Sequence, residues 1–505
     1  MNNNILLWLS GDVLHFSLSY FLKKDFGYDV NAIIDVPDKP KKFFQNQKLV
    51  DFENIWYFHE HLKKQTKKPD IEYLRNFEER FDINLQQLAV NERIFYRFND
   101  FYKFSSEEVL TILEQECRLF EDIISQVKPD FFLTPLTAFH HHQLFYEMCR
   151  KKNIKTLMIY MSKFGHRCVI SQDVNKLDFK PKLNDFKSKG RNFKELLNNF
   201  ESFNISKQIE DYKKTQTSSK LTKLQAISNF IFNNYSSSKT HYTYYGRKRS
   251  KVVLNEIKKT TQLRNRRSFI DKNLLKQIPE NQKFVYYPLH IEQERNLLIA
   301  APFYTNQTEL IRSIVKSLPI DYKLIVKEHP AQETREWRDI SEYEEIMNIP
   351  NVLLTHPDIL SKEILKKCSL VITIGGTTGL ESNFFQKPSI ILSEMDYSII
   401  PTAEFVSNIK ELPEKIKQTL QKEVISDDLD KFVQLYEANS FEFDYMQFVS
   451  KYHEKFYYNG NLLDAEIKEE DMKSFIDDNK EIILKVTNEH IKKIEQFNKL
   501  SQDEK

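Results

Sequence analysis

Glycine and threonine are concentrated in one short segment, Gly375–Gly379, which holds three of the chain's nine glycines. The segment follows an apolar run, Leu370–Ile374, that predicts a strand, and it precedes a helix-like stretch, Leu380–Gln386. A turn of this kind gathers unpaired backbone N–H groups at the positive end of a helix dipole, which suits a phosphate or diphosphate. The spacing matches neither G-x-G-x-x-G nor a P-loop, and the alternative is a tight turn that needs glycine only for positive φ. The residues expected to contact an anion are Gly375, Gly376, Thr377, Thr378 and Gly379.

A second polar group, Lys327-Glu328-His329-Pro330, ends another apolar run, Tyr322–Lys327. If that run is a parallel strand, the group lies at the carboxyl edge of the sheet, where open α/β sheets bind their ligands. Lys327 and His329 could neutralise a phosphate there, and histidine can also protonate a leaving phosphate because its pKa lies near neutrality. A solvent-facing loop is the alternative, but two anion-suited turns on one sheet edge favour a binding site.

Glu381 follows the glycine-rich segment, in the first turn of the expected helix. A carboxylate at that position stabilises the helix dipole, which is a structural role. It can equally accept hydrogen bonds from a ribose diol, which would make it part of a nucleotide site.

The histidines do not predict a metal site. His140, His141 and His142 are consecutive, and consecutive helical side chains diverge by about 100°, so we do not expect them to converge on one ion. His59 and His61 could share one face at a strand end, but the sequence offers no identifiable third ligand. We therefore expect no metal and no bound cofactor.

Apolar runs of strand length alternate with helix-like stretches from Asn281 to Leu392, which predicts a parallel sheet covered on both faces in a doubly wound lobe. The N-terminal part of the chain repeats this scheme less regularly and predicts a second α/β lobe. The expected strands are Phe284–Tyr287, Tyr322–Lys327, Asn351–Leu354, Leu370–Ile374, Ser389–Leu392, Ile5–Leu9, Val30–Val36, Asn54–Phe58, Asp130–Thr134 and Thr156–Tyr160. The expected helices are Thr308–Leu318, Ser361–Lys367, Leu380–Gln386, Leu14–Lys24, Ser106–Gln126 and His141–Lys152.

The predicted fold is α/β, with two Rossmann-like doubly wound lobes, a helical connector and a helical C-terminal tail. Residues 1–177 form the expected N-terminal lobe, and residues 281–412 form the C-terminal lobe. Between them, residues 178–280 are polar and almost free of glycine and proline, with a polar stretch at Thr215–Lys220. Residues 413–505 show a charged, helical pattern that includes Glu481–Leu500, with no convincing strand.

The bulk composition limits the classes of protein. A chain of 505 residues is longer than one hydrophobic core usually supports, so two or three domains are expected. The formal net charge of +2 makes the chain as a whole a poor match for nucleic acid. No apolar run reaches the roughly 18 residues of a membrane span, and the start of the chain lacks a signal-peptide pattern. The scattered cysteines predict free thiols in a reducing compartment, which indicates the cytoplasm. They are Cys117, Cys149, Cys168 and Cys368.

The C-terminal lobe resembles the bacterial capsule polysaccharide biosynthesis family, which contains Kdo-transferase-like glycosyltransferases of the GT-B fold. The matching segments occur in order along residues 284–392. In the N-terminal lobe only Lys163–Arg167 is similar to the family, and Gln293 departs from it where proline is expected before Glu294. The segments are FVYYPLHIEQE (Phe284–Glu294), APFYTNQ (Ala301–Gln307), LIVKEHP (Leu324–Pro330), IPNVLL (Ile349–Leu354), VITIGGTTGLES (Val371–Ser382) and KPSIIL (Lys387–Leu392).

The resemblance implies two Rossmann-like lobes with a cleft between them and a nucleotide-sugar donor on the C-terminal lobe. It implies transfer of the sugar, from a CMP-sugar such as CMP-Kdo by preference, to a surface-polysaccharide or lipid-linked glycan acceptor. One alternative is a polyol-phosphate transferase of the teichoic-acid type, and another is a non-catalytic GT-B-like assembly subunit at the membrane. The donor-binding residues expected are Lys327, Glu328, His329, Gly375, Gly376, Thr377, Thr378, Gly379, Glu381, His290 and Glu294, with His329 also catalytic.

An acceptor base would then be expected on the N-terminal lobe. Asp12 follows the first strand at the carboxyl edge of its sheet, where a carboxylate could deprotonate a sugar hydroxyl. His15 and His166 are rival candidates. The alternative for Asp12 is an N-cap of the helix that begins near Leu14.

The stretch Gly246–Arg267 holds nine lysines and arginines against one glutamate. Such a density can bind anionic lipid headgroups or an acidic glycan acceptor, and nucleic acid is formally possible. A solvated helix face is the structural alternative. We expect a cytoplasmic protein that can lie peripherally on the inner face of the membrane. The residues assigned to an acceptor or membrane surface are Arg247, Lys248, Arg249, Arg264, Arg266 and Arg267.

Overall fold

The computed structural model describes residues 3–64, 67–179, 181–202, 242–335 and 337–503, with isolated positions at 222, 225, 228 and 229. The chain forms two compact units, each built from separate stretches. The first unit contains residues 1–178, 203–247 and 439–505, and the second contains residues 179–202 and 248–438. The stretch Thr215–Lys220 lies outside the described residues.

The first unit is built on a seven-stranded sheet in the order β13-β6-β5-β4-β1-β2-β3. Its five strands from β5 to β3 are parallel, whereas β6 and β13 each pair antiparallel with their neighbour. The strands are β1 (Asn4–Leu9), β2 (Asp29–Ile34), β3 (Ile55–Tyr57), β4 (Phe131–Thr134), β5 (Lys155–Met161), β6 (Arg167–Ser171) and β13 (Phe441–Glu442).

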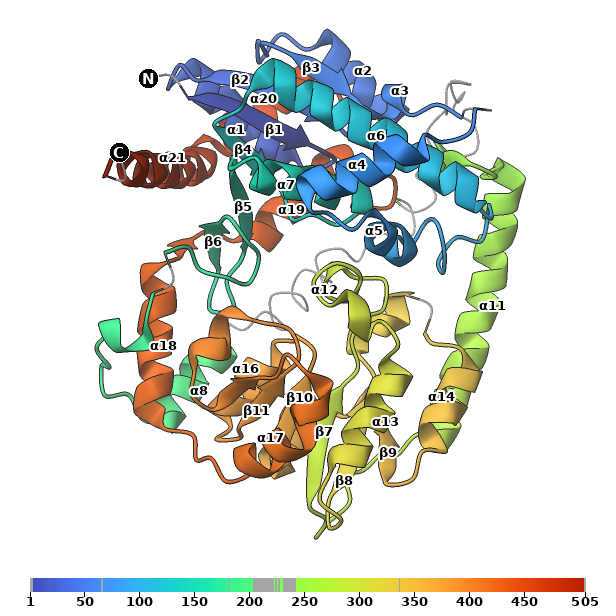
Figure 1. Cartoon of the computed structure of the whole chain (residues 1–505), viewed down its shortest axis with the longest axis vertical. Coiled ribbons are helices and arrows are strands. Elements are labelled where there is room, and N and C mark those ends of the chain that lie inside the picture. The colour runs from blue at the N-terminus through green and yellow to red at the C-terminus, as the bar shows by residue number, and fades with distance from the viewer. Residues whose placement is uncertain are drawn as a thin grey trace. The chain divides into compact units, whose positions relative to one another are not determined.

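Helices cover both faces of this sheet because its strands are apolar on both sides. In β1, Ile5, Leu7 and Leu9 enter one core, while Leu6 and Trp8 enter the other. The long helix α6 and the shorter α4 lie side by side on one face (Figure 1). The helices are α1 (Val13–Lys24), α2 (Asp38–Asn46), α3 (Phe58–His61), α4 (Ile71–Phe81), α5 (Leu85–Asn91), α6 (Ser106–Val127), α7 (His140–Lys151), α19 (Tyr445–Phe456), α20 (Glu469–Asp478) and α21 (Lys480–Asp503).

The end of the chain returns to this first unit. Strand β13 extends the sheet beyond β6, with Phe441 opposite Cys168. Helix α21 packs on α1, and its Ile483, Val486 and Ile494 join the same core as β1. The tail is helical as predicted, with β13 as a short strand that the sequence did not reveal.

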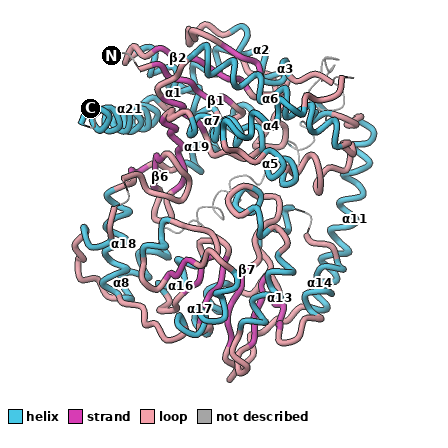
Figure 2. Tube along the Cα trace, in the orientation of Figure 1, coloured by secondary structure: helices cyan, strands magenta, loops and turns pink. Residues whose placement is uncertain are grey.

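The second unit is built on a six-stranded sheet in the order β12-β11-β10-β7-β8-β9, in which every pair is parallel. Figure 2 shows these strands in magenta with cyan helices around them. The strands are β7 (Phe284–Pro288), β8 (Lys323–Lys327), β9 (Val352–Thr355), β10 (Leu370–Thr373), β11 (Ser389–Ile391) and β12 (Ala403–Phe405).

The helices of the second unit also cover two faces. One core includes Val285, Leu324 and Ile372, and the other includes Tyr286, Ile325 and Val371. The alternation shows that β7, β8 and β10 are buried on both sides. The helices are α8 (Phe193–Ser202), α11 (Arg249–Asn273), α12 (Arg295–Leu298), α13 (Gln307–Ser317), α14 (Ile340–Met347), α15 (Ser361–Lys367), α16 (Thr378–Phe384), α17 (Leu412–Thr419) and α18 (Ser426–Ala438).

The predicted fold class, α/β with two Rossmann-like lobes and helical additions, is confirmed. Every predicted strand and helix is present with its ends shifted by at most two residues. The sequence did not predict β6, β12 and β13, which are short or lie at sheet edges. All four cysteines are free and buried, as predicted. In the described residues, no helix combines the length and apolar character needed to cross a membrane.

The buried position of β8 gives a stability prediction. Ile325 is fully buried in the middle of the sheet, so Ile325→Ala should lower the free energy of unfolding by about 2–5 kcal/mol through lost burial and a cavity. Ile320 is 95% exposed in the turn before β8, so Ile320→Ala should change it by less than about 0.5 kcal/mol. Urea denaturation monitored by circular dichroism measures both, and equal losses would contradict the assignment of β8 to the core.

Candidate functional site

Four neighbouring strands of the second unit, β10, β7, β8 and β9, end at one edge of the sheet. Pro288 at the end of β7 pairs with Lys327 at the end of β8, and Lys327 pairs with Thr355 at the end of β9. In β10, Val371 pairs with Tyr286, which places Thr373 at the same edge. The turns that follow these strands therefore begin together, and we call this region the phosphate edge: His290–Glu294, Lys327–Pro330 and Gly375–Glu381.

Lys327 is a buried cation at the phosphate edge. Its side chain is almost wholly buried, and its one hydrogen bond within the described residues is a long one, 3.4 Å from Nζ to the Glu328 backbone oxygen. Burial lowers the pKa of Lys327 to about 8, although Glu328, Asp358 and Glu381 attract its charge. An ammonium without an ion-pair partner is stabilised by any anion that reaches it.

His329 lies on the exposed side of the same turn. The backbone N–H of Ala331 donates to His329 Nδ1 at 3.1 Å. Because Nδ1 accepts this hydrogen bond, the proton of the neutral ring is on Nε2. The turn thus carries an imidazole N–H one residue beyond Glu328 and two beyond Lys327.

The backbone N–H groups of the glycine-rich segment differ in whether a protein group accepts from them. The N–H of Gly376 donates to Thr373 Oγ1 at 3.1 Å, and that of Gly379 donates to the Gly376 oxygen at 3.2 Å. The N–H groups of Thr377 and Thr378 have no acceptor in the described part of the chain. Helix α16 is only seven residues long, so these two amides, rather than a long helix dipole, are what the segment provides.

Close packing explains why glycine occupies this segment. None of its three glycines has positive φ, so the conformational explanation considered from the sequence is wrong. A Cβ on Gly376 would lie 3.0 Å from His290 Cε1. A Cβ on Gly379 would lie 2.9 Å from both Thr373 Cγ2 and the Tyr397 hydroxyl, which itself donates to the Gly376 oxygen at 2.5 Å.

Glu381 lies beside Lys327 and the segment. Its carboxylate accepts a hydrogen bond of 3.3 Å from Thr377 Oγ1. Burial raises the pKa of Glu381, and the hydrogen bond from Thr377 and the charge of Lys327 oppose that increase. The carboxylate therefore faces the phosphate edge, where a hydroxyl-bearing ligand could reach it.

Glu328 has a different role from its neighbours because protein donors occupy both its oxygens. Oε1 accepts from the His329 backbone N–H at 2.8 Å. Oε2 accepts from Arg338 Nε at 2.8 Å and from the Tyr343 hydroxyl at 2.9 Å. Glu328 is fully buried, so it fixes the turn that carries Lys327 and His329.

Arg338 connects this turn to the loop after β7. Its guanidinium also pairs with Glu292 and donates to the His290 backbone oxygen at 2.7 Å. The His290 ring lies on Thr373, with 3.0 Å between Nε2 and Oγ1. Burial lowers the pKa of His290 to about 3, helped by His329 and Arg338, so this ring is neutral and positions the Gly376 loop. Glu294, the remaining predicted residue, is half-buried and immediately precedes α12.

In the first unit, Asp12 caps helix α1. Its Oδ1 accepts from the Leu14 backbone N–H at 2.9 Å, and its Oδ2 lies 3.1 Å from His15 Nδ1 and 3.2 Å from the Tyr445 hydroxyl. His15 is fully buried beneath it, whereas His166 is half-exposed and paired with Asp444 at 2.9 Å. The capping alternative for Asp12 is thus realised, and the acceptor base stays a prediction.

The predicted basic residues have different environments. Arg266 donates to the Trp337 oxygen at 3.0 Å and pairs with Asp339, while Arg267 pairs with Asp358 at 2.8 Å. These two arginines hold α11 against the second unit. Arg247 lies over the Phe101 ring in the first unit. The exposed residues of the predicted set are Arg247, Lys248, Arg249 and Arg264.

Sequence reasoning missed the residues that position the site. They are Arg338, Tyr343, Thr373 and Tyr397, each of which makes a hydrogen bond with Glu328 or Gly376. Most of these partners are too far apart in the sequence for a local pattern to reveal the contact. One signal was available, because Thr373 is a polar residue near the end of an otherwise apolar run. Arg338 had no such signal, since its partners lie in other turns.

The fold and the site define an α/β protein with two Rossmann-like lobes, the second of which carries a buried lysine and unpaired N–H groups at one edge of its sheet. The profile of the family described as capsule polysaccharide biosynthesis protein matches residues 183–425. The family resemblance drawn from the sequence is therefore confirmed over this part of the chain, which includes the whole phosphate edge. No protein with a curated description matches the chain.

Several solved structures are similar to the chain at low identity. A UDP-GlcNAc 2-epimerase from Methanocaldococcus jannaschii, in complex with UDP-GlcNAc and UDP, is 12% identical over 86% of this chain and 99% of its own, with a TM-score of 0.25. KpsC from Thermosulfurimonas dismutans, a β-Kdo 2,7 transferase, is 11% identical over 72% of this chain and 87% of its own, with a TM-score of 0.29. At these TM-scores the similarities carry no argument about function.

The pKa of Lys327 gives a prediction for anion binding. Between pH 7 and pH 9 its protonated fraction should fall from about nine-tenths to about one-tenth, so inorganic pyrophosphate should bind roughly tenfold more weakly at pH 9. Pyrophosphate gains negative charge over this range, which acts in the opposite direction. Isothermal titration calorimetry at both pH values measures the change.

The variant Lys327→Met fills the same space without the charge, so it should bind pyrophosphate weakly at both pH values. Lys323→Met, at the other end of β8, is the matched control and should keep the wild-type pH dependence. Equal affinity in the wild type and Lys327→Met would show that pyrophosphate binds elsewhere.

Proposed function

We propose that this protein is a glycosyltransferase that moves a sugar from a nucleotide-activated donor to a surface-polysaccharide or lipid-linked glycan acceptor. The observation that carries the proposal is Lys327, a buried ammonium without an anionic partner among the described residues, next to the unengaged amides of Thr377 and Thr378. The family match supports a role in capsule polysaccharide synthesis. We favour a CMP-sugar such as CMP-Kdo as the donor, on the family resemblance alone.

In the proposed reaction, the bond between the anomeric carbon and the phosphate oxygen breaks, and the electron pair stays on the phosphate. An acceptor hydroxyl forms the new bond to the anomeric carbon and loses its proton to a base. The negative charge that develops on the departing nucleotide meets Lys327 and the two amides, while His329 donates its Nε2 proton in a hydrogen bond. Because these groups are fixed before the substrate arrives, they stabilise the transition state without reorganising.

The other parts of the donor have candidate partners at the same edge. We propose that Glu381 accepts hydrogen bonds from the ribose hydroxyls, because its carboxylate lies close enough to Lys327 to interact with its charge. His290, Glu328 and the glycines position these groups through the contacts described above. Since the protein itself supplies the cationic and N–H groups, we propose a reaction that needs no metal ion at the phosphate edge.

The proposal assigns the acceptor to Asp12 and to the exposed basic residues. Asp12 remains the proposed base, although its oxygens already hold helix α1, His15 and Tyr445. The exposed basic residues Arg247, Lys248, Arg249 and Arg264 are proposed to attract an acidic glycan or the anionic inner face of the membrane.

A panel of nucleotides tests the donor assignment. CMP, CDP, UDP and GDP are added separately to the purified full chain, and its melting temperature is measured. At a concentration about 100 times the dissociation constant, the cognate nucleotide should raise the melting temperature of the second unit by roughly 5–10 °C. The increase should disappear in Lys327→Met, shrink in His329→Ala and persist in Lys323→Met.

A turnover assay with CDP-glycerol and CMP-sugars, read together with this panel, separates the alternatives. Turnover of CDP-glycerol but not of any CMP-sugar would replace the glycosyltransferase by a polyol-phosphate transferase. Stabilisation by none of the nucleotides would reject donor binding and leave a non-catalytic assembly subunit.

A further inference from the structure

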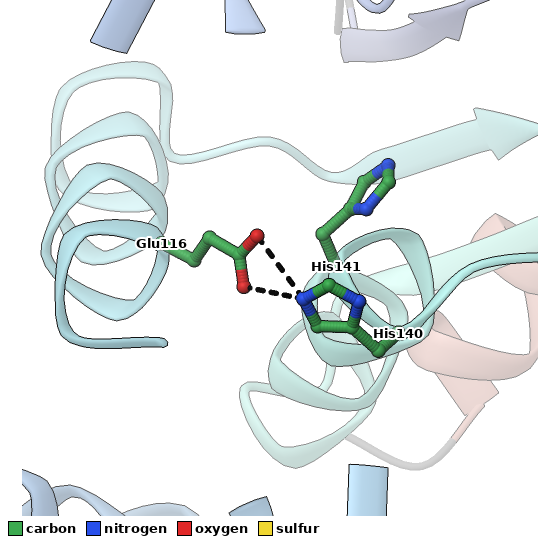
Figure 3. A group of neighbouring side chains, drawn as sticks. All are labelled: Glu116, His140 and His141. Carbon is green, nitrogen blue, oxygen red and sulfur yellow. Dashed lines mark hydrogen bonds and ion pairs between the residues drawn. The ribbon is translucent and has the colours of Figure 1, made fainter. Parts of the chain in front are cut away.

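A second group of ionisable side chains lies inside the first unit, apart from the phosphate edge. Glu116 projects from the middle of α6, and His140 and His141 begin α7, just after strand β4 (Figure 3). All three side chains are buried, and their ligand atoms lie within 4.8 Å of one another. The two oxygens of Glu116 are 2.9 and 3.2 Å from His140 Nε2.

Only one of the three consecutive histidines, His142, diverges from the other two. His142 turns away, stacks on Trp8 with 4.4 Å between ring centroids, and bonds to Thr134. His140 and His141 lie with their rings nearly perpendicular, at 89° and 5.3 Å between centroids. In this arrangement one nitrogen of each ring can approach Glu116, which supplies the third ligand that the sequence did not identify.

A carboxylate holds the far nitrogen of each ring. His140 Nδ1 is 2.9 Å from Glu92 Oε2, and His141 Nε2 is 3.1 Å from Asp35 Oδ2. Metal-bound imidazoles are characteristically held in this way, because the outer carboxylate takes the N–H and turns the opposite lone pair inward. The inward nitrogen of His141, Nδ1, is 3.0 Å from the Tyr242 hydroxyl, which also bonds to Glu116.

These contacts require a positive centre between Glu116 and His140. If Glu92 accepts the Nδ1 proton, then Nε2 and the Glu116 carboxylate are both acceptors, yet they lie 2.9 Å apart. Either a second proton or a metal ion can resolve this opposition. Ligands of a tetrahedral zinc ion lie about 3.3 Å apart, so an ion would replace the direct Glu116–His140 hydrogen bond after a small opening of that contact, and the remaining atoms would draw in by roughly 1.5 Å at most.

The ligand set of the cluster suits a divalent ion. Glu116 and both histidines are buried, and Glu92 and Asp35 hold the outer nitrogens of the two rings, with His59 on the other oxygen of Asp35. Two imidazoles and a carboxylate are ligands that Zn²⁺ takes in proteins. We propose that Glu116, His140 and His141 bind a divalent transition-metal ion, Zn²⁺ by the chemistry of its imidazole and carboxylate ligands, with Tyr242 at the fourth position.

The proposed ion has a structural role. It joins α6, the start of α7 and Tyr242, which the chain contributes from beyond the N-terminal sheet. Since all its ligands are buried, binding should stabilise the first unit rather than expose a reactive ion to substrate. The metal site does not depend on the proposed glycosyltransferase activity, so the result of either experiment leaves the other proposal unchanged.

The purified full chain tests the site directly. Its metal content is measured by inductively coupled plasma mass spectrometry, and the chain is then stripped with a chelator and titrated with Zn²⁺. We expect close to one zinc ion per chain and a rise in melting temperature on the order of 5–10 °C when zinc is restored. A chain that contains no metal and is not stabilised by Zn²⁺, Co²⁺ or Mn²⁺ would overturn the proposal and leave a proton between Glu116 and His140.

Variants distinguish this site from adventitious binding. Glu116→Gln keeps the size of the side chain and can donate to His140, so it should fold and bind zinc at least tenfold more weakly. His142→Gln is the matched control, because it removes an adjacent histidine outside the cluster and should keep the zinc content of the wild type. Equal zinc affinity in Glu116→Gln and the wild type would mean an adventitious ion only. If Glu116→Gln does not fold, His141→Gln makes the same comparison.

Discussion

The parallel alignment of β7, β8 and β10 is the constraint on which the phosphate edge depends. Because the three strands run in the same direction, their carboxyl ends meet, and the turns after them begin within reach of one another. Both faces of these strands are buried, so a slip of one residue would turn apolar side chains out of one core and into the other. The register is therefore fixed by packing, and the positions of Lys327 and Thr373 follow from it.

Two neighbouring charges have different surroundings at the end of β8. Lys327 ends the strand, Glu328 begins the turn after it, and their side chains have different hydrogen-bond partners. The Glu328 carboxylate binds Arg338 and Tyr343, and Lys327 keeps its charge without a partner among the described residues. Without Arg338, the buried carboxylate would lose its ion-pair partner, and Lys327, whose charge it already attracts, would be drawn to it. The arginine thus keeps the ammonium available for a ligand.

The two sheets use their carboxyl edges differently. In the second unit, the polar groups at the edge include a half-buried glycine-rich turn and unpaired amides. In the first unit, Asp35 follows β2 and His140 follows β4, but their side chains bind other protein groups in the interior. The same topology therefore yields an edge suited to an exchangeable ligand in one unit and a closed polar cluster in the other.

The sequence by itself determined most of the strands and helices, the two Rossmann-like lobes, the resemblance to the capsule polysaccharide biosynthesis family and the turns that meet at the phosphate edge, because apolar periodicity and the Lys327 and Gly375 turns are local patterns. It did not determine which of these residues contact one another. The reason that Gly379 is glycine is a close approach by Thr373 and Tyr397, and Glu328 positions the turn only because Arg338 reaches it. From the sequence we expected the side chains of His140 and His141 to diverge, whereas tertiary packing brings both toward Glu116. These features required the tertiary structure because each depends on side chains from distant segments, whose distances and burial no local pattern encodes.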